Sequence, residues 1–149
     1  NFQSLWAFPD DYIMKINLPV VGLARVQAMY PIGSLQRAGA RIVGGSDWPV
    51  SSMNPLLAIE TAVTRRDPSG LTPDALNEAE AMTLADMIEA YTANGAYLAH
   101  REDETGRLMP GYKADLVVLG ANLFTLAPSE IGEVPIVMTF FEGKKVYPK

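Results

Sequence analysis

One carboxylate stands out in this sequence because of the residues around it. Asp47 lies in the run Gly44-Gly45-Ser46-Asp47-Trp48-Pro49-Val50, at the end of an apolar segment that predicts a short buried strand over residues 40–45. In α/β proteins, ligands and catalytic groups gather just past the carboxyl ends of such strands. The two glycines leave room for a metal ion, a water molecule or a substrate. Asp47 is therefore a candidate metal ligand and a candidate acceptor of a proton from metal-bound water.

The same residues also fit ordinary structural roles. Gly-Ser-Asp is common in turns, where the Asp side chain accepts hydrogen bonds from nearby backbone amides. Trp48 either lines a substrate pocket or packs beside Pro49. Arg25, on a predicted helix, either contacts an anionic group of a substrate or is a solvated surface residue. The local pattern leaves both interpretations open at each position.

Nitrogen and sulfur ligands for a metal ion are scarce in this sequence. The chain has no cysteine and a single histidine, which excludes thiolate ligands and disulfides. His100 lies in a polar stretch, without a second His or Cys at the spacing of a ligand pair. We interpret it as a surface residue.

The elements predicted before Asp47 alternate between strand and helix. Residues 2–8 predict a short strand, and a helical pattern then runs from about Val20 to Leu35, with interruptions at Pro31 and Gly33. Gly39 suits the end of this helical stretch. The apolar positions of the helical stretch are Leu23, Val26 and Tyr30.

Three helices are predicted after Asp47. Asn54 and Pro55 suit the N-cap and the first position of one helix. Residues 67–82 are loop-like, and Thr83 then opens a second helix with a pattern similar to a capping box. Thr92 is a candidate cap for a short third helix. The buried positions predicted for the first two helices are Leu56, Ile59, Val63, Leu84, Met87, Ile88 and Tyr91.

The last third of the sequence reads as β-structure. Strands are predicted at 115–119, 136–141 and 145–147, with a hairpin turn at 142–144. A charged connector, 101–105, precedes them. The order indicates an α/β region over residues 1–100 and a β region over 101–149. A complete (β/α)8 barrel takes about 250 residues, so this chain is too short to hold one.

The composition fits one compact folded unit. Of 149 residues, 48% are hydrophobic and 19% are charged, which excludes a disordered acidic chain. The net charge of −5 and the scattered basic residues argue against a nucleic-acid surface. No apolar stretch approaches the roughly 20 residues of a membrane span. No basic start of a signal peptide is visible, and we expect a cytoplasmic protein.

Several segments, taken in order, resemble one known family. Gly45-Ser46-Asp47-Trp48-Pro49-Val50 resembles the segment after the eighth barrel strand of the amidohydrolase superfamily. Its Trp-Pro extension resembles the amidohydrolase-3 group, which includes N-substituted formamide deformylase-like proteins. Residues 90–96 (Ala-Tyr-Thr-Ala-Asn-Gly-Ala) resemble that group's ayTxNxA helix, and residues 106–119 and 137–147 resemble its last strands. The resemblance runs from about Gly39 to the end of the sequence.

The resemblance implies a fold that this chain holds in part. Residues 1–100 would form the C-terminal part of a TIM (β/α)8 barrel, about its last two βα units, and residues 101–149 the C-terminal strands of a small β-sandwich. Asp47 would bind a divalent metal, typically one or two zinc ions, and help to deprotonate the attacking water. The family's histidine ligands, a His-x-His pair after the first barrel strand and others from the middle strands, have no counterpart here.

The expected function is that of a C-terminal fragment of a metal-dependent amidohydrolase. It would hydrolyse an amide- or formamide-type C–N bond in a small molecule, and would be inactive without the upstream barrel. That upstream part, or self-association, would have to cover the open sheet edges. Two alternatives remain: a non-catalytic regulatory or binding protein on the same scaffold, similar to an exoenzyme regulator, and a free-standing α/β module. The metal content of the full-length parent separates the hydrolase from the regulatory or binding protein.

Overall fold

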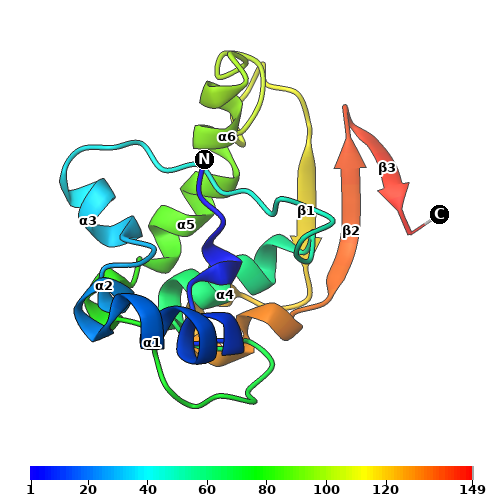
Figure 1. The fold of residues 1–149 in the computed structure, drawn as a ribbon. Helices are drawn as coiled ribbons and strands as arrows, with labels where there is room; N and C mark the ends of the chain where they lie inside the picture. The colour runs from blue at the N-terminus through cyan, green and yellow to red at the C-terminus, as the bar shows by residue number, and fades with distance from the viewer. Residues whose placement is uncertain (149) are drawn as a thin grey trace.

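A computed structural model describes residues 1–148 as a helical body with a three-stranded antiparallel sheet at one side (Figure 1). The helices are α1 (Leu18–Val21), α2 (Leu23–Gln27), α3 (Ile32–Arg37), α4 (Pro55–Thr64), α5 (Leu84–Tyr91) and α6 (Ala93–Leu98). The strands are β1 (Leu116–Leu119), β2 (Ile136–Phe141) and β3 (Lys144–Tyr147). The 3-10 helices are η1 (Ser4–Trp6), η3 (Glu78–Glu80), η4 (Leu123–Thr125) and η5 (Pro128–Glu133), and Tyr12–Asn17 is π-helical. None of the helices within residues 1–148 combines the length and apolar character that crossing a membrane requires.

Helix α4 lies at the centre of the molecule and packs against η1, η5 and α5. Its start is fixed by Asn54, whose side chain accepts a hydrogen bond from the backbone N–H of Leu56 at 3.0 Å, and by Pro55 at the first turn. Both positions were predicted from the sequence. The main core gathers around this helix: Ile32, Ile42, Leu56, Ile59, Ala62, Met82, Met87, Ala90, Leu123, Ile131 and Val134.

Helix α5 begins as predicted, at Thr83, whose hydroxyl accepts a hydrogen bond from the Asp86 N–H at 3.1 Å. The predicted cap of α6 is wrong. Thr92 makes no capping bond and instead donates its hydroxyl to the carbonyl of Ile88, four residues back, at 2.7 Å. A threonine near a helix end has both options, and here the i−4 carbonyl competes successfully with the cap.

The helical stretch before residue 40 is more broken than predicted. Gly22, at φ +80°, separates α1 from α2, and Pro31 precedes α3. Gly33 lies inside α3. A side chain at this position would be crowded, because its Cβ would come within 3.1 Å of the Glu80 carbonyl oxygen. Leu23, one of the apolar positions of the helical pattern, is 60% exposed. Gly39 follows the helix in the left-handed region, at φ +90°, as predicted.

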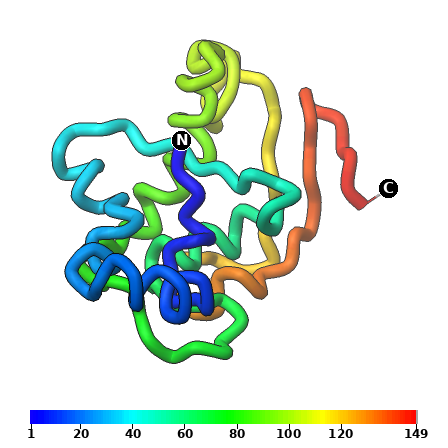
Figure 2. Tube along the Cα trace, in the orientation of Figure 1, coloured from blue at the N-terminus to red at the C-terminus, as the bar shows by residue number. Residues whose placement is uncertain are grey.

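The two strands predicted at 2–8 and 40–45 are reduced to a single parallel bridge between Phe2 and Gly44. Two backbone hydrogen bonds form it, from Phe2 N to Val43 O at 2.8 Å and from Gly45 N to Phe2 O at 3.1 Å. The strand prediction fails beyond Phe2 because the chain turns into η1, where the Ser4 hydroxyl donates to the Ala58 carbonyl of α4 at 2.8 Å. Figure 2 shows the N-terminal segment beside the segment that leads into α4.

The predicted C-terminal strands form one antiparallel sheet in the order β1-β2-β3. Glu142 and Gly143, at φ +48° and +76°, make the tight turn between β2 and β3, which is the backbone form that matches the twist of a hairpin. Asp115 fastens β1 to this turn, because its carboxylate accepts the Glu142 N–H at 2.7 Å and the Thr105 hydroxyl at 2.9 Å. These bonds give Asp115 a structural role.

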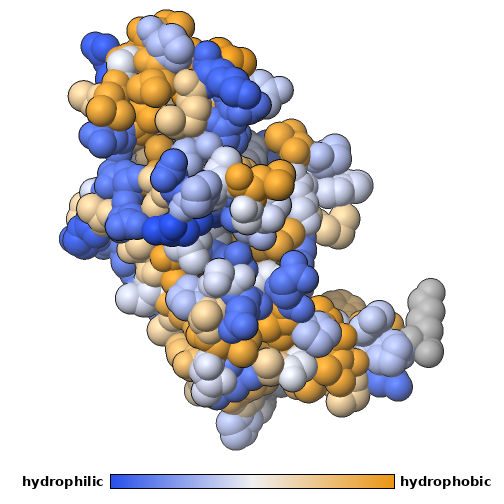
Figure 3. Space-filling model, turned by 90° about the horizontal axis from the view of Figure 1, so that it is seen from below, coloured by the Kyte–Doolittle hydropathy of each residue, from blue (hydrophilic) through white to orange (hydrophobic). Residues whose placement is uncertain are grey.

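The sheet leaves apolar side chains on the surface. Val117 is 50% exposed and Phe141 is 60% exposed. Figure 3, which views the molecule from below, shows apolar atoms at the surface next to the C-terminal end of the chain. β1 and β3 are the edge strands, and β1 offers an unpaired edge to another segment.

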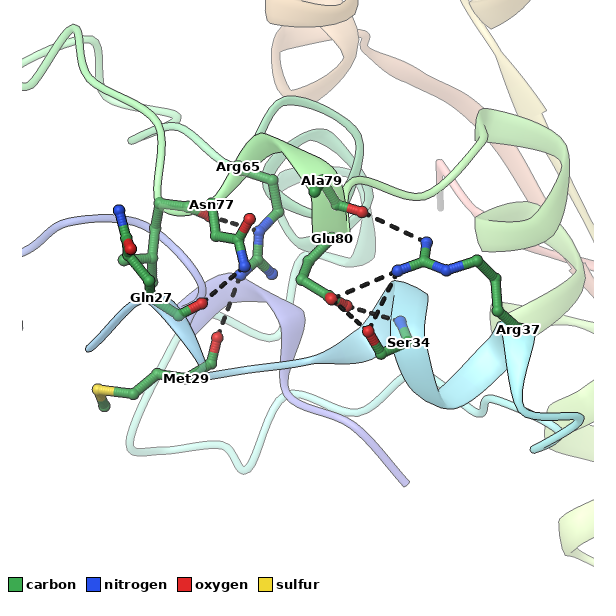
Figure 4. A network of polar contacts seen from close by, with 9 residues as sticks. Gln27, Met29, Ser34, Arg37, Arg65, Asn77, Ala79 and Glu80 are labelled. Carbon is green, nitrogen blue, oxygen red and sulfur yellow. Dashed lines mark hydrogen bonds and ion pairs between the residues drawn. The ribbon is translucent and has the colours of Figure 1, made fainter. Parts of the chain in front are cut away.

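Residues 67–82 form a loop, as predicted, apart from the single turn of η3. A buried arginine holds one end of this loop (Figure 4). Arg65, just after α4 at φ +58°, is 0% exposed, and donates Nε to Leu76 O at 2.8 Å and Nη2 to Met29 O at 3.4 Å. Asn77 adds a bond to Gln27 O at 2.6 Å. The loop is thereby tied to the end of α2.

Glu80 anchors the other end of the loop to α3 (Figure 4). Its carboxylate accepts hydrogen bonds from the backbone N–H of Ser34 at 2.6 Å and from the Ser34 hydroxyl, and it pairs with Arg37 at 3.4 Å. Glu80 is 6% exposed. A buried carboxylate needs such partners, since an unpaired one would be costly in a low-dielectric interior.

Candidate functional site

The segment from Gly44 to Ser51 carries the residue with the strongest chemical signal. Asp47 is exposed and adopts a left-handed backbone conformation, φ +52°, which Asp tolerates better than most residues. Its carbonyl accepts the N–H of Val50 at 2.8 Å, which closes a tight turn over Trp48 and Pro49. The backbone of this turn therefore sets where the carboxylate can reach.

Two serines fix the turn from either side of Asp47. The Ser46 hydroxyl accepts the Trp48 N–H at 3.2 Å, and the Ser51 hydroxyl donates to the Ser46 carbonyl. Within residues 1–148, the Asp47 carboxylate itself makes no hydrogen bond and no ion pair. The capping role that ordinary turn chemistry would give this side chain is thus taken by Ser46, and the carboxylate is free to meet something else.

The glycines before Asp47 face two different surroundings. A Cβ at Gly44 would lie 2.3 Å from Cε2 of Tyr91, on α5, so the tyrosine ring occupies the space a side chain would need. A Cβ at Gly45 would lie 2.4 Å from Oδ1 of Asn1. Asn1 in turn accepts a hydrogen bond from Gln3 Nε2 at 2.6 Å. The helix layer therefore lies on one side of this segment and polar amide side chains on the other.

The two predicted substrate contacts are placed differently. Trp48 is 62% exposed next to Asp47, so its ring is open to a ligand and does not pack in the core. Arg25 is exposed on α2, where its guanidinium donates to Val21 O at 3.3 Å. Figure 1 shows α2 at the left and the segment before α4 toward the right. Within residues 1–148, Arg25 makes no hydrogen bond or ion pair with Asp47.

The described residues do not form a complete metal site. No group of three or more His, Cys, Asp or Glu side chains gathers in this part of the chain as metal ligands would. His100 lies at the end of α6, exposed and at φ +56°. Asp47 supplies one oxygen ligand at most, and one carboxylate is too few to hold a divalent ion in a structural or catalytic site.

A groove of about 1070 Å³ lies elsewhere, between α5–α6 and β1. Its lining includes Leu108 and Phe124, which are 83% and 65% exposed, with Arg101 and Asp115 at its rim. Asp115 is already bonded to Thr105 and to the β2–β3 turn. Glu89, on α5, is another exposed carboxylate of the lining and makes no hydrogen bond or ion pair within residues 1–148. It does not gather with two further His, Cys, Asp or Glu side chains as metal ligands would, and the Asp47 turn remains the candidate site.

Sequence reasoning missed the contacts that support this turn. Tyr91 was expected to be a buried position of a helix, and Asn94 was noted within a motif, yet neither was linked to Asp47. In the structure both contact the segment before it, through the Gly44 backbone and the Ile42 carbonyl. The available signal was the pair of adjacent glycines, since the side chain missing at Gly44 leaves space for an aromatic ring.

The family model described as "Amidohydrolase family" matches residues 6–147 of the chain. The protein named as amidohydrolase YtcJ of Bacillus subtilis is 30% identical over 129 residues, which are 87% of this chain and 24% of that protein. N-substituted formamide deformylase of Arthrobacter pascens is 32% identical over 117 residues, 77% of this chain and 21% of that enzyme. The chain spans about a quarter of the length of these relatives.

A solved structure shares the fold. An uncharacterized metal-dependent hydrolase from Pyrococcus horikoshii superposes with a TM-score of 0.60 and 23% sequence identity, covering 81% of this chain and 25% of that one. The combination of helices with a three-stranded antiparallel sheet seen here therefore has a counterpart inside a larger protein. At this level of identity the likeness concerns the fold alone.

Proposed function

Because the chain belongs to the amidohydrolase family, we propose that it is the C-terminal part of a metal-dependent hydrolase that cleaves a C–N bond in a small molecule. Residues 1–100 would complete a (β/α)8 barrel, and residues 101–149 would contribute strands to a sandwich beside it. The comparisons do not favour the alternative of a non-catalytic binding protein, since the named relatives include an amidohydrolase and a deformylase.

The observation that carries this proposal is the free carboxylate of Asp47. It is exposed, lies three residues beyond a parallel bridge and makes no bond within residues 1–148. Parallel strands that are bridged end at the same edge of a sheet, where catalytic groups of α/β proteins gather. At that edge the Asp47 carboxylate is free of local hydrogen bonds, because the Ser46 hydroxyl accepts the backbone N–H of the turn. A free carboxylate suits a metal ligand and proton acceptor.

We propose that the metal ion is bound jointly by this chain and by other parts of the parent protein. The residues described here give one oxygen ligand, so the remaining ligands would come from other parts of the parent protein. Zinc suits such a site, because it accepts histidine nitrogen together with carboxylate oxygen. Asp47 would then serve on one side of the site as ligand and as acceptor of a proton from the attacking water.

The substrate class follows from the relatives and from the surroundings of Asp47. The named deformylase acts on N-substituted formamides, and an amide- or formamide-type carbonyl is the group we propose here. Trp48 offers an exposed aromatic face beside the carboxylate, which suits an apolar part of such a substrate. Arg25 lies on α2, and its contact with a substrate stays a prediction.

The test is an Asp47→Asn variant of the full-length parent protein. Asn keeps the size of the side chain but cannot accept a proton, so kcat should fall by a factor of about 100 to 10,000. The amount of bound metal, measured by inductively coupled plasma mass spectrometry, should fall as well. Asp103→Asn is the matched control, because Asp103 is exposed in the charged connector. Unchanged turnover and metal content in Asp47→Asn would refute the proposal.

A further inference from the structure

The corner between α5 and α6 contacts the segment before Asp47 at three points. The backbone N–H of Gly44 donates to the Ala90 carbonyl at 3.1 Å. The side chain of Asn94 donates to the Ile42 carbonyl at 3.0 Å. The ring of Tyr91 lies against Gly44. From these contacts we infer that Tyr91 and Asn94 are positioning residues for Asp47, an inference that rests on the proposed function of Asp47.

The geometry of an extended chain explains why this corner can hold the segment. The carbonyl of one residue and the N–H two residues later point to the same edge of a strand. Ile42 O and Gly44 N therefore share one edge, which the α5–α6 corner occupies. Val43 O and Gly45 N share the other edge, which Phe2 occupies. The segment is bonded on both edges, and its sliding or twisting is restricted.

Tyr91 fixes the segment in the third direction. A Cβ at Gly44 would lie 2.3 to 2.6 Å from three atoms of the ring, so the ring and the bare backbone are in direct contact. Burial raises the pKa of the Tyr91 phenol above its usual value, although the Ser4 side chain opposes this shift, and the phenol stays neutral. The ring, rather than the hydroxyl, is the part that positions Gly44.

The distance from these contacts to the carboxylate is short along the chain. Gly44 is three residues before Asp47, and the turn beyond it is closed by Ser46 and by the Val50 N–H. A shift of the segment is therefore passed to Asp47 without a flexible linker between them. In a catalytic site a displacement of about 1 Å can reduce the rate by about 100-fold, so modest loosening would have a measurable effect.

The experiment compares Asn94→Asp and Asn94→Ala in the full-length parent protein. Asp is nearly the same size as Asn but, when ionised, cannot donate to the Ile42 carbonyl, and Ala removes the group altogether. Loss of one hydrogen bond corresponds to a factor of about five to ten. Both variants should increase hydrogen–deuterium exchange of residues 42–50 by about that factor, and should lower kcat while KM stays within about twofold.

Two further variants separate positioning from general stability. Asn77→Gly removes a comparable amide bond, to Gln27 O at 2.6 Å, and glycine tolerates the positive φ of Asn77. It should leave exchange of residues 42–50 unchanged. Tyr91→Phe keeps the ring and should behave as the unmodified protein, whereas Tyr91→Ala should resemble Asn94→Ala. Unchanged exchange at 42–50 in the Asn94 variants would overturn the inference.

The two proposals fail in different ways. If Asp47 has no role in hydrolysis, Asp47→Asn keeps full turnover, while exchange in the Asn94 variants still reports whether the corner holds the segment. If the corner does not position Asp47, Asp47→Asn loses turnover but the Asn94 variants keep both slow exchange and normal kcat. An equal fall in kcat for Asn77→Gly and Asn94→Ala would also count against positioning, since it would indicate a loss of overall stability.

Discussion

At the scale of single residues, the buried pair of Arg65 and Glu80 shows how charge is accommodated in the core. Burial lowers the pKa of the Arg65 guanidinium to about 10, although the nearby Glu80 charge opposes this shift. The guanidinium stays protonated at neutral pH and uses its N–H groups on two backbone carbonyls. The Leu76 and Met29 carbonyls thereby receive donors, whereas Nη1 of Arg65 is buried and has no hydrogen-bond partner within residues 1–148.

The Glu80 carboxyl leads to a prediction about acid stability. Burial alone would raise its pKa, but hydrogen bonds from Ser34 and the charges of Arg37 and Arg65 outweigh burial, so the pKa lies below its usual range. The folded state therefore favours the ionised form. The stabilisation is fully present above the unfolded pKa, about 4.3, and is lost as the pH falls through the lower folded value.

We therefore expect Glu80→Gln to lose stability at pH 7 and little at pH 3. Hydrogen bonds to a charged acceptor contribute about 1.5 to 3 kcal/mol, and this sets the expected loss at pH 7. Urea denaturation of the chain at a series of pH values measures it. Glu78→Gln is the control, because Glu78 makes only an exposed ion pair with Arg66, worth about 0 to 1 kcal/mol. A loss for Glu80→Gln that is equal at both pH values would contradict the assignment.

At the scale of secondary structure, the two threonines of α5 and α6 can be compared directly. Thr83 caps α5 through the Asp86 N–H, whereas the Thr92 hydroxyl donates back to Ile88 O. Thr83→Ala should lower the free energy of unfolding by about 1 kcal/mol. Thr92→Ala should change it by less than about 0.5 kcal/mol, since the i−4 bond adds little to a helix. Equal losses from the two substitutions, measured by thermal or urea unfolding, would show that the cap is not the cause.

The elements that local chemistry determines were predictable from the sequence. Asn54 with Pro55, Thr83, and the Glu142-Gly143 turn each carry their signal within a few residues, and the structure has the corresponding boundaries. Elements that depend on distant partners were not predictable. The strand expected at 2–8 ends at η1 because Ser4 finds a carbonyl on α4, 54 residues away. No local pattern contains that contact.

Among individual residues too, those marked by a local pattern were predictable and those that depend on distant partners were not. Asp47 could be identified because its own run of residues is distinctive and because glycines precede it. The buried Arg65 and Glu80, and the support from Tyr91 and Asn94, could not, because a charged or polar side chain is usually exposed unless the fold supplies partners. Those partners lie 36 to 52 residues away in sequence for the Arg65–Met29 and Asn94–Ile42 bonds.

At the scale of the whole molecule, the surface carries features that suit contact with further protein. β1 has an unpaired edge, and the groove beside it is lined by exposed apolar side chains such as Leu108 and Phe124. Exposed apolar patches of this kind usually mark an interaction site. Since the chain spans about a quarter of its curated relatives, we propose that other parts of the parent protein cover these surfaces.

This leads to the last prediction, that the 149-residue chain has no hydrolase activity by itself. It supplies one candidate ligand, Asp47, and no cluster of ligands within residues 1–148, so the purified chain should not turn over an N-substituted formamide and should retain no zinc after dialysis. Mixing it with the separately produced upstream part of the parent should restore turnover and metal binding together. The same mixture made with Asp47→Asn should bind the upstream part but remain inactive, because the exposed apolar surfaces are unchanged. Turnover by the chain alone would show that residues within it suffice for catalysis, and would replace the shared site proposed here.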